Sequence, residues 1–170
     1  MVRVIPGDEV GINLAAVAIK QGNLVAIPTE TVYGLAANAL NENAVLKIFE
    51  VKQRPFFDPL IIHLANREAI SDYAILEDER LKKLSEKFLP GPLTLLLPKK
   101  NIIPDVVTSG LSQVGVRIPN NSLTKKILEK INFPLAAPSA NPFGYVSPTS
   151  AQHVEKYLGE KIKYFLVWLS

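Results

Sequence analysis

The sequence predicts an α/β or mixed α+β fold, because short β-like apolar runs alternate along the chain with longer segments of helical periodicity. The composition is that of a folded protein, since 48% of the residues are hydrophobic and 21% are charged. A length of 170 residues is typical of one domain. We therefore expect an α/β or mixed α+β fold in a single domain over residues 1–170.

The first 64 residues of the chain predict strands and capped helices in turn. Strands are expected at residues 2–5, 24–27 and 60–64, and helices at residues 8–21 and 41–52. Asp8 and Asn41 are suitable N-caps for these two helices, and Gly22 ends the first. The second helix should bury a face made of Val45, Ile48 and Phe49.

The first helix has apolar residues on two faces, which predicts that it is covered on two sides. One face carries Val10, Leu14, Val17 and Ala18. The other carries Ile12, Ala15, Ala16 and Ile19.

The rest of the chain continues the alternation of helices and strands. A stripe of Leu81, Leu84 and Phe88 predicts a helix that ends before Pro90. A second stripe predicts a helix through Leu123, Ile127, Leu128 and Ile131. Further strands are expected at 93–97, 114–118, 135–137 and 162–169, and a last helix at 148–159.

Composition excludes several classes of function. The chain has no cysteine, which rules out disulfides, thiolate metal sites and cysteine nucleophiles. Its two histidines are far apart and give no metal-ligand spacing, so no metal site is predicted. The net charge of +3 allows a polyanionic partner without requiring one. No uncharged apolar run is long enough to span a bilayer, and we expect a cytoplasmic protein without a membrane partner.

The first of four polar segments that border strands is residues 28–35, where Thr29, Glu30, Thr31 and Tyr33 crowd into one loop. Ligands in open α/β sheets bind beyond strand ends, so this placement suits a binding site. The alternative is a capped turn in which the threonine hydroxyls bond to the backbone. Gly34 permits a positive φ or a close backbone approach.

The second polar segment contains Lys52 and Arg54. Two cations at positions i and i+2 point the same way only in an extended backbone, which Pro55 favours for Arg54. An extended Lys-x-Arg would be a phosphate clamp. The alternative is a solvated helix end, where cations interact with the helix dipole.

The third and fourth segments hold an arginine within a strand and a cluster of small polar residues. Arg117 lies in the apolar strand 114–118, where it should either meet a carboxylate or an anionic ligand, or lie on an exposed face. In the fourth segment, small residues beside Ser139 and Asn141 allow close approach to a ligand, although a turn followed by a helix cap is also common.

Taken together, these segments resemble the YrdC-like threonylcarbamoyl-AMP synthases. The matching stretches are PTETVYGLAANA, KQRPFFDPLIIHL, PGPLTLLL, SQVGVRIP and APSANPFG followed by SPT. They occur in the order and spacing of the family and cover residues 20–150. The resemblance implies a twisted mixed β-sheet flanked by helices, with a large basic concave cavity on one side.

The resemblance also implies a reaction and its substrates. L-threonine, bicarbonate and ATP would give L-threonylcarbamoyl-AMP and pyrophosphate, with Mg²⁺ accompanying the nucleotide. A downstream threonylcarbamoyl-transferase complex would then modify the N6 of an adenosine in tRNA.

Residue roles carried over from the family divide into a threonine set and an ATP set. By resemblance, threonine would be bound by Thr29, His63, Arg117 and Ala137. ATP would be bound by Lys52, Arg54, Gln113, Ser139, Asn141 and Ser147, and the first two would be catalytic. Position 113 is often threonine in relatives, so the contact of Gln113 is the least direct of these assignments.

The end of the chain differs from that of its relatives, and two alternative functions stay open. Relatives continue beyond the last predicted strand with segments that help to close the nucleotide site, and the chain ends at Ser170, so it resembles a short form of the domain. One alternative function is a module that binds double-stranded RNA or tRNA without synthase activity. Another is a carbamoyl-transfer relative, which the lack of zinc-finger cysteines disfavours.

Overall fold

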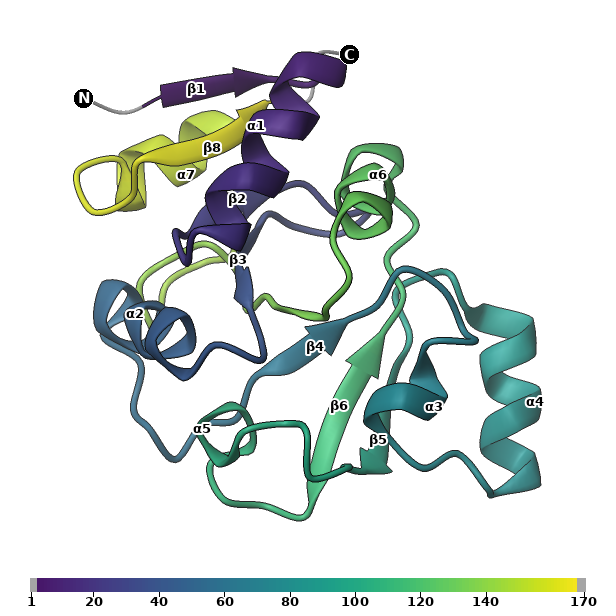
Figure 1. Cartoon of the computed structure of the whole chain (residues 1–170). Coiled ribbons are helices and arrows are strands. Elements are labelled where there is room, and N and C mark those ends of the chain that lie inside the picture. Colours follow the sequence, from purple (N-terminus) through teal and green to yellow (C-terminus); the bar gives the residue numbers. More distant parts are fainter. Residues whose placement is uncertain (1–2, 168–170) are drawn as a thin grey trace.

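The computed structural model describes residues 3–167, which form an eight-stranded mixed β-sheet with helices on both of its faces (Figure 1). The strands are β1 (Arg3–Pro6), β2 (Val25–Ile27), β3 (Gly34–Asn38), β4 (Ile61–His63), β5 (Thr94–Pro98), β6 (Gln113–Arg117), β7 (Leu135–Ala136) and β8 (Tyr164–Val167). The helices are α1 (Glu9–Lys20), α2 (Glu42–Lys52), α3 (Ile70–Tyr73), α4 (Glu79–Phe88), α5 (Asp105–Thr108), α6 (Ser122–Lys130) and α7 (Ala151–Leu158). This architecture confirms the predicted fold class.

The strand order is β1-β8-β2-β3-β7-β4-β6-β5. Strands β1, β8 and β2 pair in parallel, as do β4 and β6, whereas the other neighbours are antiparallel. Strand β7 joins the two halves of the sheet, because Ala136 pairs with Ala37 of β3 on one side and with Ile62 of β4 on the other. The segment that follows β7 therefore leaves the sheet at its centre.

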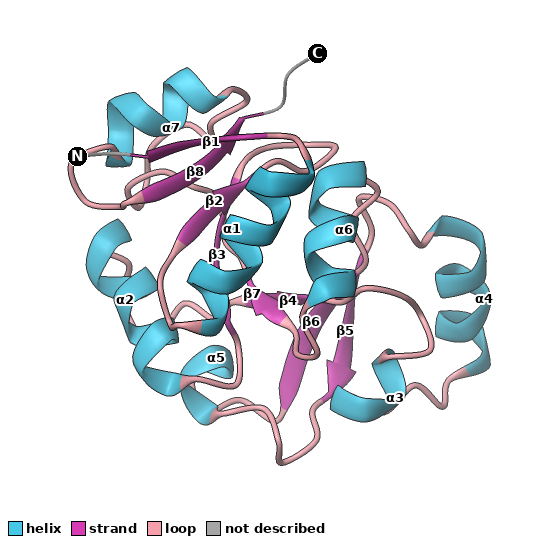
Figure 2. Cartoon of the chain, turned by 45° about the horizontal axis from the view of Figure 1, so that its top comes forward, coloured by secondary structure: helices cyan, strands magenta, loops and turns pink. Residues whose placement is uncertain are grey.

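Successive strand residues point to two separate apolar clusters, one on each face of the sheet. Ala26, Leu35 and Ala136 belong to the cluster that packs against α2, α5 and α7. Val25 and Leu135 belong to the cluster that packs against α1 and α6, which lie side by side over this second face (Figure 2). Among the described residues, no helix is both long and apolar enough to cross a membrane.

The predicted caps of α1 and α2 and the predicted core faces of α2 and α6 are confirmed. The side chain of Asp8 accepts a hydrogen bond from the backbone N–H of Gly11 at 2.8 Å, and Asn41 accepts one from Ala44 at 3.2 Å. The predicted core faces of α2 and α6 are buried; they are Val45, Ile48 and Phe49, and Leu123, Ile127, Leu128 and Ile131.

The prediction that α1 is covered on two sides is wrong. Ile12 and Ile19 are buried against the sheet and α6, but Val10, Leu14 and Val17 are 65%, 48% and 51% exposed. The physical reason is that α1 lies at the β1 edge of the sheet, so within the described chain one layer packs against it.

The predicted apolar stripe of α4 is likewise only partly buried. Leu84 is 39% exposed and Phe88 is 47% exposed, whereas Leu81 is half-buried and the small Ser85 is buried. Helix α4 flanks β5 at the end of the sheet, as Figure 1 shows, so little of its surface meets the core.

Three elements were not predicted from the sequence. Strand β3 consists mostly of small residues without β-branching, and α3 and α5 are four residues long, too short for a periodic pattern. At the ends, β1 and β8 agree with the predicted strands, but predicted strand residues 2, 168 and 169 lie outside the described residues. The last helix begins at Ala151 after its N-cap Ser150, slightly later than predicted.

The outer half of the sheet exposes part of the face that α6 covers elsewhere. Alternate residues on this face are exposed or half-exposed in β5 and β6, including Leu96, Gln113 and Gly115. Two of the predicted site residues, His63 and Arg117, belong to the same face, because they pair with each other in register. This face of the outer strands therefore positions the candidate site.

Candidate active site

Arg117 and His63 lie at the ends of the neighbouring parallel strands β6 and β4. They are partners in the register of the two strands, so their side chains lie next to each other on the same face. The backbone N–H of Leu64 donates to the carbonyl oxygen of Arg117 at 3.0 Å, which fixes the main chain just after β4. The sheet thus holds an imidazole beside a guanidinium.

Arg117 forms an ion pair with Glu30, which confirms the expectation that this strand arginine meets a carboxylate. Its Nη2 donates to Glu30 Oε1 at 2.6 Å and to Thr31 Oγ1 at 3.0 Å. The backbone N–H of Asn120 donates to the other oxygen of Glu30 at 2.9 Å. Burial acts to raise the pKa of Glu30, but the bonds from Arg117 and the backbone outweigh it and hold the pKa below its ordinary value.

The side chain of Thr29 stabilises the turn that presents Glu30. Its hydroxyl donates to the carbonyl oxygen of Val32 at 2.6 Å and accepts from the N–H of Val32 at 3.1 Å. This is the capped-turn alternative, and it fixes the loop next to Arg117. Gly34 follows the turn. Of its two predicted roles, a positive φ is not observed, whereas a close backbone approach is, since Gly34 lies close to Ala137.

Two nitrogen atoms beside this turn are buried without a hydrogen-bond partner among the described residues. They are His63 Nδ1 and Arg117 Nε, on the two paired strands. Because buried polar groups are nearly always bonded, these atoms mark a place for a polar ligand or an ordered water. We call Thr29, Glu30, His63 and Arg117 the Arg117 cluster.

Burial and the positive charge of Arg117 lower the pKa of His63 to about 4. An unfolded chain takes up a proton on histidine near pH 6.5, whereas the folded protein resists it until about pH 4. Between these values the unfolded state binds more protons, so stability must fall as the pH is lowered through this window. The effect reaches about 3 kcal/mol, since one pKa unit corresponds to roughly 1.4 kcal/mol.

We therefore expect His63→Asn to reduce the loss of stability between pH 6.5 and 4, as measured by urea denaturation. His153→Gln, at the exposed second histidine, is the matched control and should keep the wild-type slope. Equal slopes for wild type and His63→Asn would contradict a buried neutral imidazole.

Lys52 is buried and bonded to the main chain, so the alternative of a solvated helix end is wrong for this residue. It is 1% exposed, and its Nζ donates to the carbonyl oxygens of Ser139 and Asn141, each at 2.5 Å. Burial and repulsion from Arg54 lower the pKa of Lys52 to about 8. The two carbonyl bonds act in the opposite direction and favour the charged form.

The predicted extended Lys-x-Arg backbone is also not observed. Lys52 ends α2, and Gln53 caps the helix in a left-handed conformation with φ of 53°. Arg54 forms an ion pair with Asp58 at 2.9 Å and lies 5.9 Å from the ring centroid of Phe143. We call Lys52, Arg54, Ser139 and Asn141 the Lys52 cluster.

The segment after β7 connects the two clusters. The N–H of Ala137 donates to the carbonyl oxygen of Ile61 on β4 at 3.2 Å, two residues before His63. Ser139 forms a β-bridge with Gly34, at the end of the turn that carries Thr29. The segment after β7 therefore borders three groups of predicted site residues. They come from α2, from the 28–34 turn, and from β4 with β6.

A cavity of about 510 Å³ opens beside the 28–34 turn. It is lined by Pro28, Thr29, Glu30, Tyr33, Asn120, Asn121, Thr149, Ser150, Ala151 and Gln152. None of these lining residues is a lysine or arginine. The cations predicted to make the cavity basic are occupied within the protein, since Arg117 bonds to Glu30, Arg54 to Asp58 and Lys52 to the main chain.

Two residues of the predicted ATP set lie farther out. Gln113 is exposed at the start of β6, at the opposite end of that strand from Arg117. Ser147 is exposed next to Pro148, whose carbonyl oxygen accepts from the N–H of Tyr33 at 2.8 Å. For both, no hydrogen bond to the rest of the predicted set is observed among the described residues.

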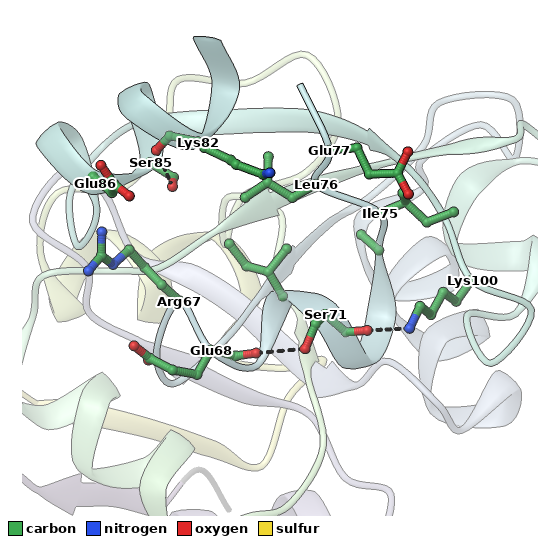
Figure 3. Close-up of a pocket in the computed structure, with 12 residues that line it drawn as sticks. Arg67, Glu68, Ser71, Ile75, Leu76, Glu77, Lys82, Ser85, Glu86 and Lys100 are labelled. Atoms are coloured by element: carbon green, nitrogen blue, oxygen red, sulfur yellow. Dashed lines mark hydrogen bonds between the residues drawn. The ribbon is translucent and has the colours of Figure 1, made fainter. Parts of the chain in front are cut away.

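A larger cavity of about 680 Å³ lies elsewhere, between α3 and α4 (Figure 3). Arg67, Lys82 and Lys100 line it together with Glu68, Glu77 and Glu86. Ile70 and Ala74 contribute apolar surface. It contains none of the predicted site residues.

The sequence assigned no role to Glu30 or Asn120, although both contact the predicted site. The signal available was the carboxylate within the polar 28–35 segment, but a partner 87 residues away cannot be read from spacing. Among the described residues, no group of three or more metal-ligating His, Cys, Asp or Glu side chains comes together.

Comparison with known proteins identifies the family. Residues 17–167 match the Sua5/YciO/YrdC family model, described as "Telomere recombination". A curated relative from Pyrococcus abyssi, named threonylcarbamoyl-AMP synthase, is 51% identical over 92% of this chain and 46% of its own length.

Two solved structures are similar to the fold. P. abyssi Sua5 complexed with L-threonine has a TM-score of 0.93 and 47% identity, covering 98% of this chain and 50% of that one. Full-length HypF in the phosphate- and nucleotide-bound form has a TM-score of 0.81 and 26% identity, covering 92% of this chain and 24% of that one.

These matches extend over nearly the whole described chain. The chain spans about half the length of the P. abyssi relative. Because the family model covers most of its residues, the chain belongs to the Sua5/YciO/YrdC family.

Proposed function

We propose that this chain carries an L-threonylcarbamoyladenylate synthase site. In the proposed reaction the amine of L-threonine attacks bicarbonate, which gives a carbamate and releases water. A carbamate oxygen then attacks the α-phosphorus of ATP, forming threonylcarbamoyl-AMP and releasing pyrophosphate. The relative from P. abyssi is named for this activity.

The observation that carries the proposal is the pair of unpartnered buried nitrogens in the Arg117 cluster. Arg117 Nε and His63 Nδ1 lie on paired strands beside the 28–34 turn. A guanidinium with free donors suits the threonine carboxylate, and a neutral imidazole suits a hydroxyl or amine. That P. abyssi Sua5 was solved with L-threonine supports this assignment. Ala137 would contribute main-chain contacts.

The nucleotide would lie on the Lys52 cluster. Lys52 places a buried positive charge against the Ser139–Asn141 segment and retains one N–H beyond the two carbonyl bonds. Arg54 would add a second cation by exchanging Asp58 for a phosphate, and Ser147 and Gln113 would contact the outer parts of the nucleotide. Full-length HypF, a longer protein that contains a similar fold over 24% of its chain, was solved in a nucleotide-bound form, which is consistent with this proposal.

Catalysis would be electrostatic and positional. Negative charge develops on the phosphate oxygens as the carbamate attacks, and fixed cations stabilise it. Holding three reactants on one rigid surface removes much of the entropic barrier. The described residues offer no carboxylate cluster for Mg²⁺, so any Mg²⁺ would be held mainly by the nucleotide, and we derive no step through it.

The product would be consumed by a separate transferase complex that modifies tRNA at N6 of adenosine. That complex would have to take up a reactive mixed anhydride, so release from this site must precede transfer. Direct binding of tRNA or double-stranded RNA is the competing function, and it would show a steep dependence of affinity on salt.

The test is pyrophosphate release from purified protein with ATP and bicarbonate, in the presence and absence of L-threonine. We expect release only when threonine is present. Arg67→Met, in the cavity between α3 and α4, is the matched control and should retain the activity. Release that does not depend on threonine, or RNA binding without any release, would contradict the proposal.

A further inference from the structure

Glu30 is an acidic residue inside a site that is expected to receive an anionic substrate. Its side chain is 21% exposed, and its two oxygens are divided between Arg117 Nη2 and the backbone N–H of Asn120. We propose that Glu30 is a positioning residue that fixes the guanidinium of Arg117 for the threonine carboxylate. This inference rests on the function proposed above.

The anchoring of Glu30 is independent of Arg117. Asn120 directly precedes Asn121, the N-cap of α6, whose side chain accepts from Leu123 and Thr124. The hydroxyl of Thr124 in turn donates to the carbonyl oxygen of Pro28, next to the Thr29 turn. One oxygen of the carboxylate is therefore held by main chain that is itself fixed, and so is the turn that carries Glu30.

The guanidinium of Arg117 is restrained through one of its three nitrogen atoms. Both of its hydrogen bonds use Nη2, and Nε stays unpartnered among the described residues. A guanidinium has five N–H donors in a planar fork, so holding one nitrogen orients the others without using them. Ordering the side chain before the ligand arrives lowers the entropic cost of binding.

Glu30 could have the opposite role and compete with the threonine carboxylate for Arg117. A carboxylate already paired with Arg117 could occupy the place of the threonine carboxylate, and its removal would then strengthen threonine binding. The second bond, from Asn120, favours positioning, because it keeps Glu30 in place when the other donors of Arg117 are engaged.

A double-mutant cycle tests the proposal by calorimetric titration of L-threonine into wild type, Glu30→Ala, Arg117→Met and the double variant. Glu30→Ala should weaken threonine binding about tenfold, because misplacement of a positioned group is costly. In the Arg117→Met background, Glu30→Ala should weaken threonine binding by less than about a further twofold. Glu30→Gln, which retains one of the two bonds, should lose less than Glu30→Ala.

Glu79→Ala is the matched control, since it removes a carboxylate from an exposed ion pair with Lys82 and should leave threonine affinity unchanged. Tighter binding by Glu30→Ala and Glu30→Gln would overturn the proposal in favour of competition. Equal losses with and without Arg117 would show that Glu30 supports the fold instead. A wild-type protein that binds no threonine would refute the proposed function itself and this inference with it.

Discussion

Replacing Lys52 with methionine is expected to lower the free energy of unfolding by about 2–4 kcal/mol. Methionine fills the aliphatic space but cannot donate to either carbonyl oxygen that Lys52 bonds. The oxygen of Asn141 loses its donor, which costs about 1–3 kcal/mol, whereas that of Ser139 keeps the N–H of Asn141 at 3.0 Å and loses one hydrogen bond worth about 0.5–1.5 kcal/mol. Relief of the buried charge offsets part of this loss, as the lowered pKa of Lys52 indicates. In a chain of this size the melting temperature should fall by roughly 5–10 °C.

Lys47→Met is the matched control, because Lys47 lies on the exposed side of the same helix and donates to one carbonyl oxygen, that of Gly22. It should cost less than about 1 kcal/mol. If Lys52→Met melted at the wild-type temperature, Lys52 would be a free ligand for phosphate, not a tether of the 139–141 segment.

Replacing Arg117 with methionine is expected to weaken threonine binding at least about 100-fold, because a carboxylate loses charge-assisted bonds worth roughly 1.5–3 kcal/mol each. ATP affinity should change less than about threefold, because no described contact joins Arg117 to the Lys52 cluster. Stability should fall only modestly, since Glu30 keeps its bond from Asn120 and is partly exposed. Separate titrations of threonine and of a non-hydrolysable ATP analogue measure both effects.

Arg67→Met is the control for this experiment too, because it removes an arginine from the cavity between α3 and α4. It should leave both affinities unchanged. Equal losses of threonine and nucleotide binding in Arg117→Met would refute the division of the site into an Arg117 cluster and a Lys52 cluster.

Much of the fold could be predicted because its signals are local. The caps at Asp8 and Asn41 and the apolar faces of α2 and α6 depend on residues within one or two turns of each other. Strand β3 was missed because its sequence, GLAAN, has no β-branched residue to signal a strand. Its pairing with β2 and β7 decides its conformation, and that is a long-range property.

The errors on α1 and α4 have a common cause. An apolar stripe predicts burial only if another layer covers it, and both helices lie near an edge of the sheet. Val10 and Phe88 are therefore exposed despite the periodic pattern around them. The position of an element in the sheet cannot be read from its own sequence.

For the candidate site, residue types were easier to predict than their environments. The sequence singled out Arg117 and Lys52, but it gave no sign that Glu30 pairs with the first or that the second is buried. The left-handed cap at Gln53 turns the chain after α2 and so decides where Arg54 lies, and a non-glycine residue with this φ is hard to foresee. The burial of a lysine is decided by segments far away in the chain.

The central claim is that the paired ends of β4 and β6 receive the threonine carboxylate. A crystal structure of this chain with L-threonine tests it most directly. We predict that the carboxylate lies within about 3 Å of the Arg117 guanidinium, with Glu30 still bonded to Nη2. Threonine bound in the cavity between α3 and α4, or a displaced Glu30 side chain, would contradict the account.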